Sequence, residues 1–289
     1  MNQLIGQIVT SFGRLFIVED CHGKTFEATT RKKRVDFACG DQVEFTPINE
    51  RQVVIERSLP RKSLLYRQDH FKTKVFAANV TQLVIVLAPV PSPNEELLQR
   101  ALVAAEEAQI TPLIVLNKSD LPEVIQWQEK LSFYQTLGYP FITLSALSDI
   151  TPLKISLEGQ CSILLGQSGM GKSTLTNALL GEEKARIGTI STALDSGKHT
   201  TTHTQLFHLN QQTQLIDSPG LQEFGLKHII PADLIHYFPD FRAFIGQCRF
   251  HNCTHRQEPN CAIKQAAENG LIEPQRLVFF QRLMDELLR

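Results

Sequence analysis

Apolar and polar residues alternate in short segments over the first 57 positions. Each segment predicts a strand, and turn signals such as Gly13 and Gly40 separate them. The expected strands cover residues 4–9, 15–18, 25–28, 42–45 and 53–56. Five short strands in so small a space are typical of an OB-fold barrel, although an unspecified β-domain would have the same composition. We therefore assign residues 1–60 to an N-terminal all-β OB-fold barrel.

From residue 83 onward, continuous apolar runs alternate with segments of helical periodicity. Asn94 is a candidate N-cap for a helix that ends near residue 108, and a third helix begins at Lys172. The second helix is expected over about 123–137. The apolar runs cover 83–88, 113–116, 141–144, 162–165 and 214–216. Buried strands that alternate with helices indicate an α/β domain with a mostly parallel sheet, which we assign to residues 61–225.

The strand pattern stops after residue 224, and residues 226–289 are assigned to a mostly helical third domain. Pro274 is expected to start the last helix. Its apolar stripe is more typical of packing within the chain than of a partner site. The stripe consists of Leu277, Phe280, Leu283, Met284, Leu287 and Leu288.

Composition narrows the class of protein. The chain has 289 residues, 42% hydrophobic and 20% charged, as expected for two or three globular domains. No apolar run reaches the roughly 18 residues of a membrane span, and the N-terminus lacks a signal-peptide pattern. We expect a cytoplasmic protein with no membrane partner. The net charge of −1 does not demand a polyanion as partner, although residues 1–70 and 226–289 are slightly basic.

A phosphate-binding motif follows the apolar run at 162–165 and opens the helix at Lys172. The sequence GQSGMGKS fits GxxxxGK[ST], whose glycines let backbone N–H groups approach phosphates at a helix N-terminus. Lys172 would bridge the β- and γ-phosphates, and Ser173 would ligate Mg²⁺. The strand–loop–helix context argues against the alternative of a simple glycine-rich turn. The predicted nucleotide-binding residues of this loop are Gly166, Gln167, Ser168, Gly169, Met170, Gly171, Lys172, Ser173 and Thr174.

The tetrapeptide that ends the strand at 113–116 fits the NKxD guanine motif. It consists of Asn117, Lys118, Ser119 and Asp120. The Asp120 carboxylate can accept hydrogen bonds from guanine N1–H and the 2-amino group, and adenine offers neither. Asn117 would hold the base edge, and the Lys118 stem would cover its face. The motif is weak alone, and it becomes strong beside a phosphate loop.

Three shorter elements complete the predicted nucleotide site. Ser145 and Ala146 match the SA element that supports guanine through a backbone amide. Asp217 and Gly220 bound a DxxG sequence, in which Asp217 would hold Mg²⁺ through water and Gly220 would meet the γ-phosphate. An Asp-Pro-Gly turn is the alternative. In the loop between the two phosphate motifs, one of three threonines would complete the Mg²⁺ shell, unless the loop is merely solvated. These are Thr200, Thr201 and Thr202.

The residue after DxxG is Leu221, where Ras-like enzymes place a glutamine that orients water. Leucine has no group that orients water, and Gln222 lies one place too far along. We therefore expect slow intrinsic hydrolysis, in which another residue or a partner positions the water. His199 is the candidate, although a single histidine in a loop is usually a surface residue.

The order of the motifs is inverted, because the guanine motif precedes the phosphate loop. Every motif is still present, which indicates a circularly permuted GTPase. DxxG is then the last nucleotide motif, and only residues 221–226 separate it from the third domain. We hypothesise that γ-phosphate loss releases this segment and re-aims the third domain.

Four candidate metal ligands lie within 14 residues of the third domain. Cys248, Cys253, His255 and Cys261 offer three thiolates and one imidazole, a set typical of structural zinc. His251 is the rival of His255, which we prefer because Cys-x-His alternation suits a tight knuckle. Four protein ligands leave no place for water, which argues against catalytic zinc. We expect one structural Zn²⁺, and Mg²⁺ with GTP.

A basic run in a connection of the barrel is a candidate RNA contact. It consists of Arg31, Lys32, Lys33 and Arg34. Nucleic acid is met at such loops of small barrels, although a solvated charge run has the same composition.

The permuted motifs, the preceding barrel and the following Cys₃His set together resemble the circularly permuted small ribosomal subunit biogenesis GTPases of bacteria (RsgA/YjeQ type). The resemblance covers essentially the whole chain and includes TPLIVLNKSDL, LLGQSGMGKSTLTNALL and CRFHNCTHRQEPNCAI. It implies GTP hydrolysis that the small subunit stimulates, in the late maturation of that subunit. It also implies that the OB-fold contacts ribosomal RNA and that the zinc domain touches the subunit.

The partners expected from this resemblance are the small ribosomal subunit, its rRNA and GTP or GDP, and we expect a monomer. The alternative function is a GTP-dependent switch that binds RNA or protein away from the ribosome. A third hypothesis is an ATPase in which the NKSD sequence is accidental.

Overall fold

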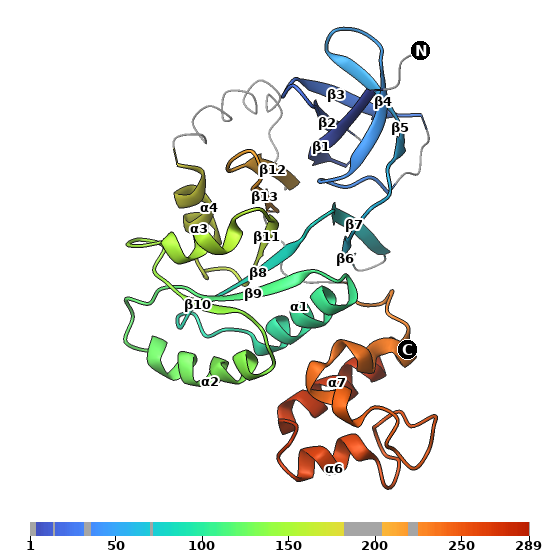
Figure 1. Ribbon diagram of the computed structural model, residues 1–289, viewed down its shortest axis with the longest axis vertical. Helices are drawn as coiled ribbons and strands as arrows, with labels where there is room; N and C mark the ends of the chain where they lie inside the picture. The colour runs from blue at the N-terminus through green and yellow to red at the C-terminus, as the bar shows by residue number, and fades with distance from the viewer. Residues whose placement is uncertain are drawn as a thin grey trace.

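The computed structural model describes residues 4–13, 15–31, 36–69, 72–181, 204–218 and 225–288. Figure 1 shows a β-barrel at the N-terminus, an α/β domain in the middle and a helical region at the C-terminus. The predicted fold class is therefore confirmed. Among the described residues, no helix is long and apolar enough to cross a bilayer.

The barrel consists of the five predicted strands, each extended by a few residues. They are β1 (Leu4–Phe12), β2 (Leu15–Asp20), β3 (Thr25–Thr30), β4 (Gln42–Pro47) and β5 (Gln52–Ser58). The strand order is β1-β2-β3-β5-β4, and β4 pairs back with β1, which closes the barrel. Alternate residues point inward, so Ile8, Val18 and Phe45 lie in a core of their own.

A hairpin that the sequence pattern did not predict follows the barrel. It consists of β6 (Leu64–Asp69) and β7 (Lys72–Ala78), which pair antiparallel. The chain between the two strands contains no Gly, Pro or Asn, so the usual turn signal is missing. Arg61, before the hairpin, pairs with the fully buried Asp41 at 2.6 Å and thereby ties this linker to the barrel.

The α/β domain is built on a six-stranded sheet of order β10-β9-β8-β11-β13-β12. Five strands are parallel: β8 (Gln82–Leu87), β9 (Thr111–Leu116), β10 (Phe141–Thr143), β11 (Cys161–Leu165) and β13 (Gln214–Asp217). The sixth strand, β12 (Thr204–His208), runs antiparallel to β13, and the sequence pattern did not predict it.

Helices cover both faces of this sheet. The helices α1 (Glu95–Glu107) and α2 (Val124–Thr136) share one apolar core with it, and α3 (Thr151–Leu157) and α4 (Lys172–Leu180) share the other. Asn94 caps α1 as predicted, because its side chain accepts a hydrogen bond from the Leu97 N–H. The seven-residue helix α3 was not predicted, since it is too short for a clear period.

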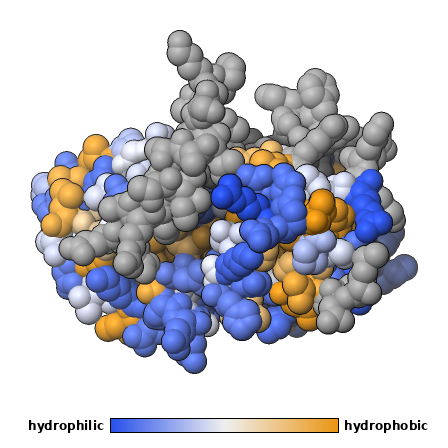
Figure 2. All heavy atoms as spheres, turned by 90° about the horizontal axis from the view of Figure 1, so that it is seen from above, coloured by the Kyte–Doolittle hydropathy of each residue, from blue (hydrophilic) through white to orange (hydrophobic). Residues whose placement is uncertain are grey.

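The barrel and the α/β sheet are continuous through one strand pair. The end of β1 pairs antiparallel with β12, with Thr10 opposite Gln205. On the neighbouring strand β2, Glu19 Oε1 lies 3.1 Å from His208 Nε2 of β12. Hydrophilic and hydrophobic residues are mixed over the described part of the face seen from above (Figure 2).

The C-terminal region consists of two 3₁₀ segments and two helices. These are η1 (Pro231–Tyr237), η2 (Pro239–Phe244), α6 (Ala262–Glu268) and α7 (Pro274–Leu287). The last helix starts at Pro274 as predicted, and most of its apolar stripe packs within the chain. Leu288 is the exception at 52% exposed, and the pattern missed the fully buried Phe279.

The C-terminal region is joined to the α/β domain by a shared apolar core. Phe238 and Phe280 belong to the same buried cluster as Leu98 of α1. Ion pairs surround this core: Arg282 pairs with Glu96 at 2.9 Å. Arg100 with Glu286 and Arg242 with Glu106 add two more. The C-terminal region and α1 therefore pack as one unit.

Candidate functional site

The phosphate loop connects β11 to α4 and leaves no room for side chains at two glycines. A Cβ at Gly166 would lie 2.3 Å from the Val86 carbonyl oxygen, and one at Gly171 would lie 2.3 Å from Asn117 Nδ2. Gly171 also has a φ of 92°, which L side chains rarely adopt. Close contacts with the Val86 backbone and the Asn117 side chain therefore exclude a side chain at Gly166 and Gly171.

Lys172 lies at the start of α4, where its ammonium group turns back over the loop. Its Nζ donates to the Gln167 carbonyl at 2.9 Å and to the Gly166 carbonyl. Burial lowers the pKa of Lys172, and the negative charge of Asp217 opposes this shift. Asp217 ends β13, so the topology brings two predicted phosphate and Mg²⁺ residues from separate motifs together.

One buried side chain joins the guanine motif to the other two elements. Asn117 is 1% exposed. Its Nδ2 donates to the Met170 carbonyl of the phosphate loop at 2.9 Å, and its Oδ1 accepts from the Ala146 N–H at 2.9 Å. The sequence predicted that Asn117 would hold the base edge. What the structure shows is that this side chain joins the phosphate loop to the SA element.

The carboxylate of Asp120 lies at the mouth of the site. Ser145 Oγ donates to Asp120 Oδ1 at 2.6 Å. This hydrogen bond is the main reason that the pKa of Asp120 lies below its ordinary value of 3.8, and Lys118 adds to the effect. The group is therefore held as a carboxylate, the form that accepts two hydrogen bonds from guanine.

A cavity of about 140 Å³ connects these elements. It is lined by Asn117, Lys118, Asp120, Leu121, Ser145, Ala146, Leu147, Gly171 and Thr174. Seven of these nine residues belong to the predicted set. Leu121 and Leu147 were missed, and their signal was only that each directly follows a predicted motif.

The segment before α1, which carries no motif, forms hydrogen bonds with two of the nucleotide motifs. Lys118 Nζ donates to the Val90 carbonyl at 2.6 Å, and the Asn94 N–H donates to Gln167 Oε1 at 3.1 Å. The segment reads APVPSPN, which suggests only a loop in the sequence. Its contacts with the nucleotide motifs arise from the tertiary fold.

Several predicted residues fall outside the part of the chain that the structure describes. These are His199, Thr200, Thr201, Thr202, Gly220, Lys32, Lys33 and Arg34. Arg31 is described: it lies at the barrel surface, is 68% exposed, and pairs with Glu56 at 2.8 Å.

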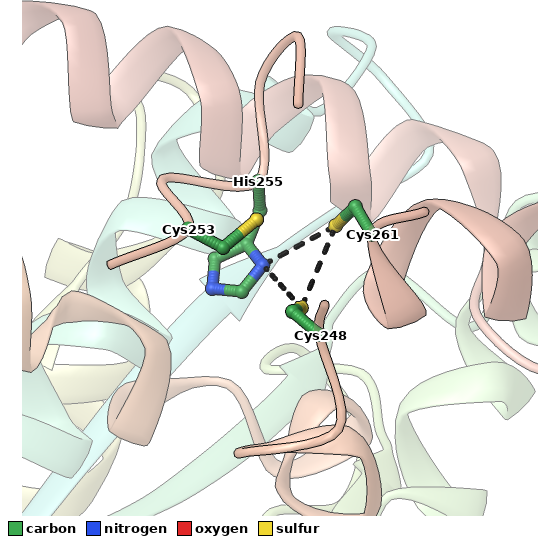
Figure 3. Close-up of side chains that lie close together, drawn as sticks. All are labelled: Cys248, Cys253, His255 and Cys261. Carbon is green, nitrogen blue, oxygen red and sulfur yellow. Dashed lines mark hydrogen bonds between the residues drawn. The ribbon is translucent and has the colours of Figure 1, made fainter. Parts of the chain in front are cut away.

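The four predicted metal ligands converge in the C-terminal region, as Figure 3 shows. His255 Nδ1 lies 3.5 Å from Cys248 Sγ and 3.3 Å from Cys261 Sγ, and these two sulfur atoms are 3.9 Å apart. All four ligand atoms, including Cys253 Sγ, lie within 4.8 Å of one another. His251 is exposed and lies outside the cluster.

These distances suit a tetrahedral zinc ion. Bonds of about 2.3 Å to sulfur and about 2.0 Å to nitrogen place two sulfur atoms about 3.8 Å apart, and sulfur and nitrogen about 3.5 Å apart. Burial raises the pKa of Cys253 to about 12 and also raises that of Cys261. Buried thiolates need a compensating charge, which Zn²⁺ supplies. The residues therefore fit the expected metal.

Short backbone turns bring the four side chains together. The Cys253 N–H donates to the Phe250 carbonyl at 3.2 Å, and His255 has a φ of 61°. Glu258 accepts hydrogen bonds from Thr254 Oγ1 at 2.6 Å and from the Thr254 N–H at 2.8 Å. Burial opposes a low pKa for Glu258, but these bonds lower its pKa to about 2.

Sequence relatives match almost the whole chain. The model of the RsgA GTPase family matches residues 58–227. A small ribosomal subunit biogenesis GTPase RsgA from Neisseria gonorrhoeae is 66% identical over 282 residues, which cover 98% of this chain and 92% of that protein. A protein of the same name from Nitrosomonas europaea is 47% identical over 288 residues, with 98% and 92% coverage.

Solved structures show the same architecture. YjeQ from Thermotoga maritima superposes with a TM-score of 0.76 at 31% identity and covers 99% of both chains. YloQ, a circularly permuted GTPase, has a TM-score of 0.71 at 26% identity and covers 99% of this chain and 95% of its own. The predicted circular permutation is thereby confirmed. The chain belongs to the RsgA GTPase family.

Proposed function

We propose that the protein hydrolyses GTP to GDP and phosphate and acts in the late maturation of the small ribosomal subunit. The subunit in turn stimulates the hydrolysis. The observation that supports this most is the Asn117 side chain, which joins a guanine motif to a phosphate loop. This geometry occurs in a chain that is 66% identical to a small ribosomal subunit biogenesis GTPase.

In this proposal each part of the nucleotide meets a different motif. Asp120 accepts guanine N1–H and the 2-amino group, and the Lys118 stem covers the base. The N–H groups of residues 166–174 and Lys172 bind the phosphates. Mg²⁺, when bound, offsets the charge that develops on them. Ser173, Asp217 and one of the threonines at 200–202 would hold it, and Gly220 would meet the γ-phosphate.

The attacking water has no glutamine to orient it, because Leu221 follows DxxG. We propose that intrinsic hydrolysis is slow, and that His199 or a group of the subunit positions the water. Docking on the subunit would then position the attacking water. This arrangement ties GTP consumption to the presence of the subunit.

The remaining parts serve recognition in this proposal. The barrel contacts ribosomal RNA through its basic run at 31–34, and Zn²⁺ on Cys248, Cys253, His255 and Cys261 stabilises the C-terminal region. The protein acts as a monomer in the cytoplasm, where ribosomes are assembled, and it has no membrane partner.

The decisive experiment measures GTP turnover with and without purified small ribosomal subunits. We expect a large increase in kcat with subunits, no increase with large subunits, and no competition by excess ATP for labelled GTP. Unchanged turnover would contradict the ribosomal partner and favour a GTP-dependent switch that acts elsewhere. Competition by ATP would contradict the guanine site itself.

A further inference from the structure

The loop between the first two zinc-ligand positions presents an aromatic ring to solvent. Phe250 is 40% exposed, and its neighbours Arg249, His251 and Asn252 are exposed as well. The loop has a defined shape: the Cys253 N–H donates to the Phe250 carbonyl at 3.2 Å, and the Arg249 N–H donates to the Asn260 carbonyl at 3.3 Å. Metal binding does not require a phenylalanine at this exposed position.

Phe250 borders an open hollow of about 490 Å³. Apolar side chains from three parts of the C-terminal region line it. Among them are Ile235 of η1, Ile245 directly after η2, and Met284 of α7. Polar groups are contributed by His236, His251 and Asn252, and the hollow adjoins the metal site, because Cys248, Cys253 and His255 also line it. None of the described residues that line this hollow is acidic.

A second hollow beside the zinc cluster has the opposite character. Its lining includes the carboxylates of Glu258 and Asp285. Asp285 pairs with Arg256, and Glu258 is held by the Thr254 hydrogen bonds, so these groups serve the local structure. The lining of this second hollow thus carries two carboxylates and the Arg256 guanidinium, whereas the lining of the hollow beside Phe250 carries no carboxylate.

We propose that the hollow beside Phe250 holds an unpaired base of single-stranded RNA, stacked on the Phe250 ring. Unpaired bases stack on exposed aromatic rings, and nearby cations meet the backbone phosphates. The Arg249 guanidinium lies 5.5 Å from the Phe250 ring centroid, so the loop offers a cation and an aromatic ring side by side. His236, His251 and Asn252 offer hydrogen bonds to a base edge.

This inference rests on the proposed function for the source of the RNA, but its test does not. The probe is a short oligouridine with 2-aminopurine at its centre, titrated with the zinc-loaded full-length protein. We expect binding to quench the fluorescence of the central base. Phe250→Ala should weaken binding about 5- to 150-fold, the range measured when a stacking aromatic residue is removed. Phe250→Tyr should restore binding, because it keeps the ring.

Leu271→Ala is the matched control, because Leu271 is a 65% exposed apolar residue of the same region that does not line the hollow. All variants should keep stoichiometric zinc and wild-type GTP affinity. The inference is overturned if the wild type leaves the probe unbound, if Phe250→Ala binds it normally, or if an abasic centre binds equally well. If Phe250→Ala weakens binding to small subunits but binds the probe normally, the hollow is occupied by a protein, and this result also overturns the inference. Absent stimulation by subunits would contradict only the proposed function.

Discussion

At the scale of single residues, base choice depends on the charge and hydrogen-bonding groups of Asp120. An amide at this position can accept from N1–H but cannot accept from the 2-amino group of guanine. We expect Asp120→Asn to lower GTP affinity by at least about 100-fold, because one hydrogen bond is lost and the other is no longer charge-assisted. Xanthine carries a C2 oxygen, to which the amide can donate. Titration with fluorescent GTP and XTP should therefore show an inverted preference, and an unchanged preference would exclude Asp120 from the base site.

The hydrogen bond from Ser145 to Asp120 predicts a pH effect. It lowers the pKa of Asp120, so the carboxylate persists to a lower pH than an isolated aspartate. Nucleotide affinity that needs the carboxylate is present above this pKa and is lost as the pH falls through it. We expect Ser145→Ala to move the acid-side loss of GDP affinity to higher pH. Ser148→Ala, at an exposed serine of the same loop, should leave the profile unchanged.

The sequence was sufficient for residues whose chemistry is carried by local motifs. The cysteines, His255, Asp120 and the phosphate-loop glycines all lie in short stretches with a required spacing. Val90 and Asn94 were not predictable as parts of the site, because they reach Lys118 and Gln167 only after the sheet has formed. Their residue types carry no signal, since Val90 and Asn94 each contribute a backbone group.

At the scale of elements, the buried pair of Arg276 and Asp240 locks α7 to η2. Their side chains are 2% and 3% exposed, and Arg276 Nη2 lies 2.8 Å from Asp240 Oδ1. Asp240→Ala would leave a buried guanidinium without its partner, so we expect a loss of stability of about 3–5 kcal/mol. Chemical denaturation should detect it.

Arg282→Ala provides the matched control for that loss. Arg282 is 56% exposed and pairs with Glu96 on α1. Solvent screens such a pair, so its removal should cost no more than about 1 kcal/mol. Equal losses in the two variants would contradict a special role for the buried pair.

Elements with a clear period were predictable, and those defined by long-range pairing were not. The alternating barrel strands and the capped helix α1 carry their signals within a few residues. The strand β12 is held between β13 and β1, two strands that lie far apart in the sequence. Five residues of mixed polarity become a strand there because both neighbours supply hydrogen bonds, which no local pattern contains.

At the scale of the whole molecule, zinc is expected to stabilise one region and not the nucleotide site. Cys253→Ala should lose zinc by elemental analysis, and Cys21→Ala, at an exposed cysteine of the barrel, should retain it. Loss of zinc should raise hydrogen exchange in residues 248–261, because their turns depend on the four ligands. GDP affinity should stay unchanged, since the apolar core and the α1 ion pairs still hold η1 and α7. Retained stoichiometric zinc in Cys253→Ala would refute the ligand set.

The contacts of the C-terminal region also change our expectation of how the bound nucleotide alters affinity for the subunit. The sequence alone suggests that the signal passes through residues 221–226, which join DxxG to this region. The structure adds a second connection, because the region shares an apolar core with α1. The N–H of Asn94, the N-cap of α1, is bonded to Gln167 of the phosphate loop. We expect that a region held by this core and by several ion pairs keeps its orientation when one connecting segment is released.

We therefore expect nucleotide-dependent affinity for the small subunit to survive a long Gly/Ser insertion between Phe224 and Gly225. The measurement compares subunit binding with a non-hydrolysable GTP analogue and with GDP. Arg100→Met combined with Arg282→Met removes the ion pairs of α1 with α7, and this variant should reduce the difference between the two nucleotides. Both residues lie outside the nucleotide site, so GTP binding itself should be unaffected. Loss of the difference in the insertion variant alone would instead show that residues 221–226 transmit the signal.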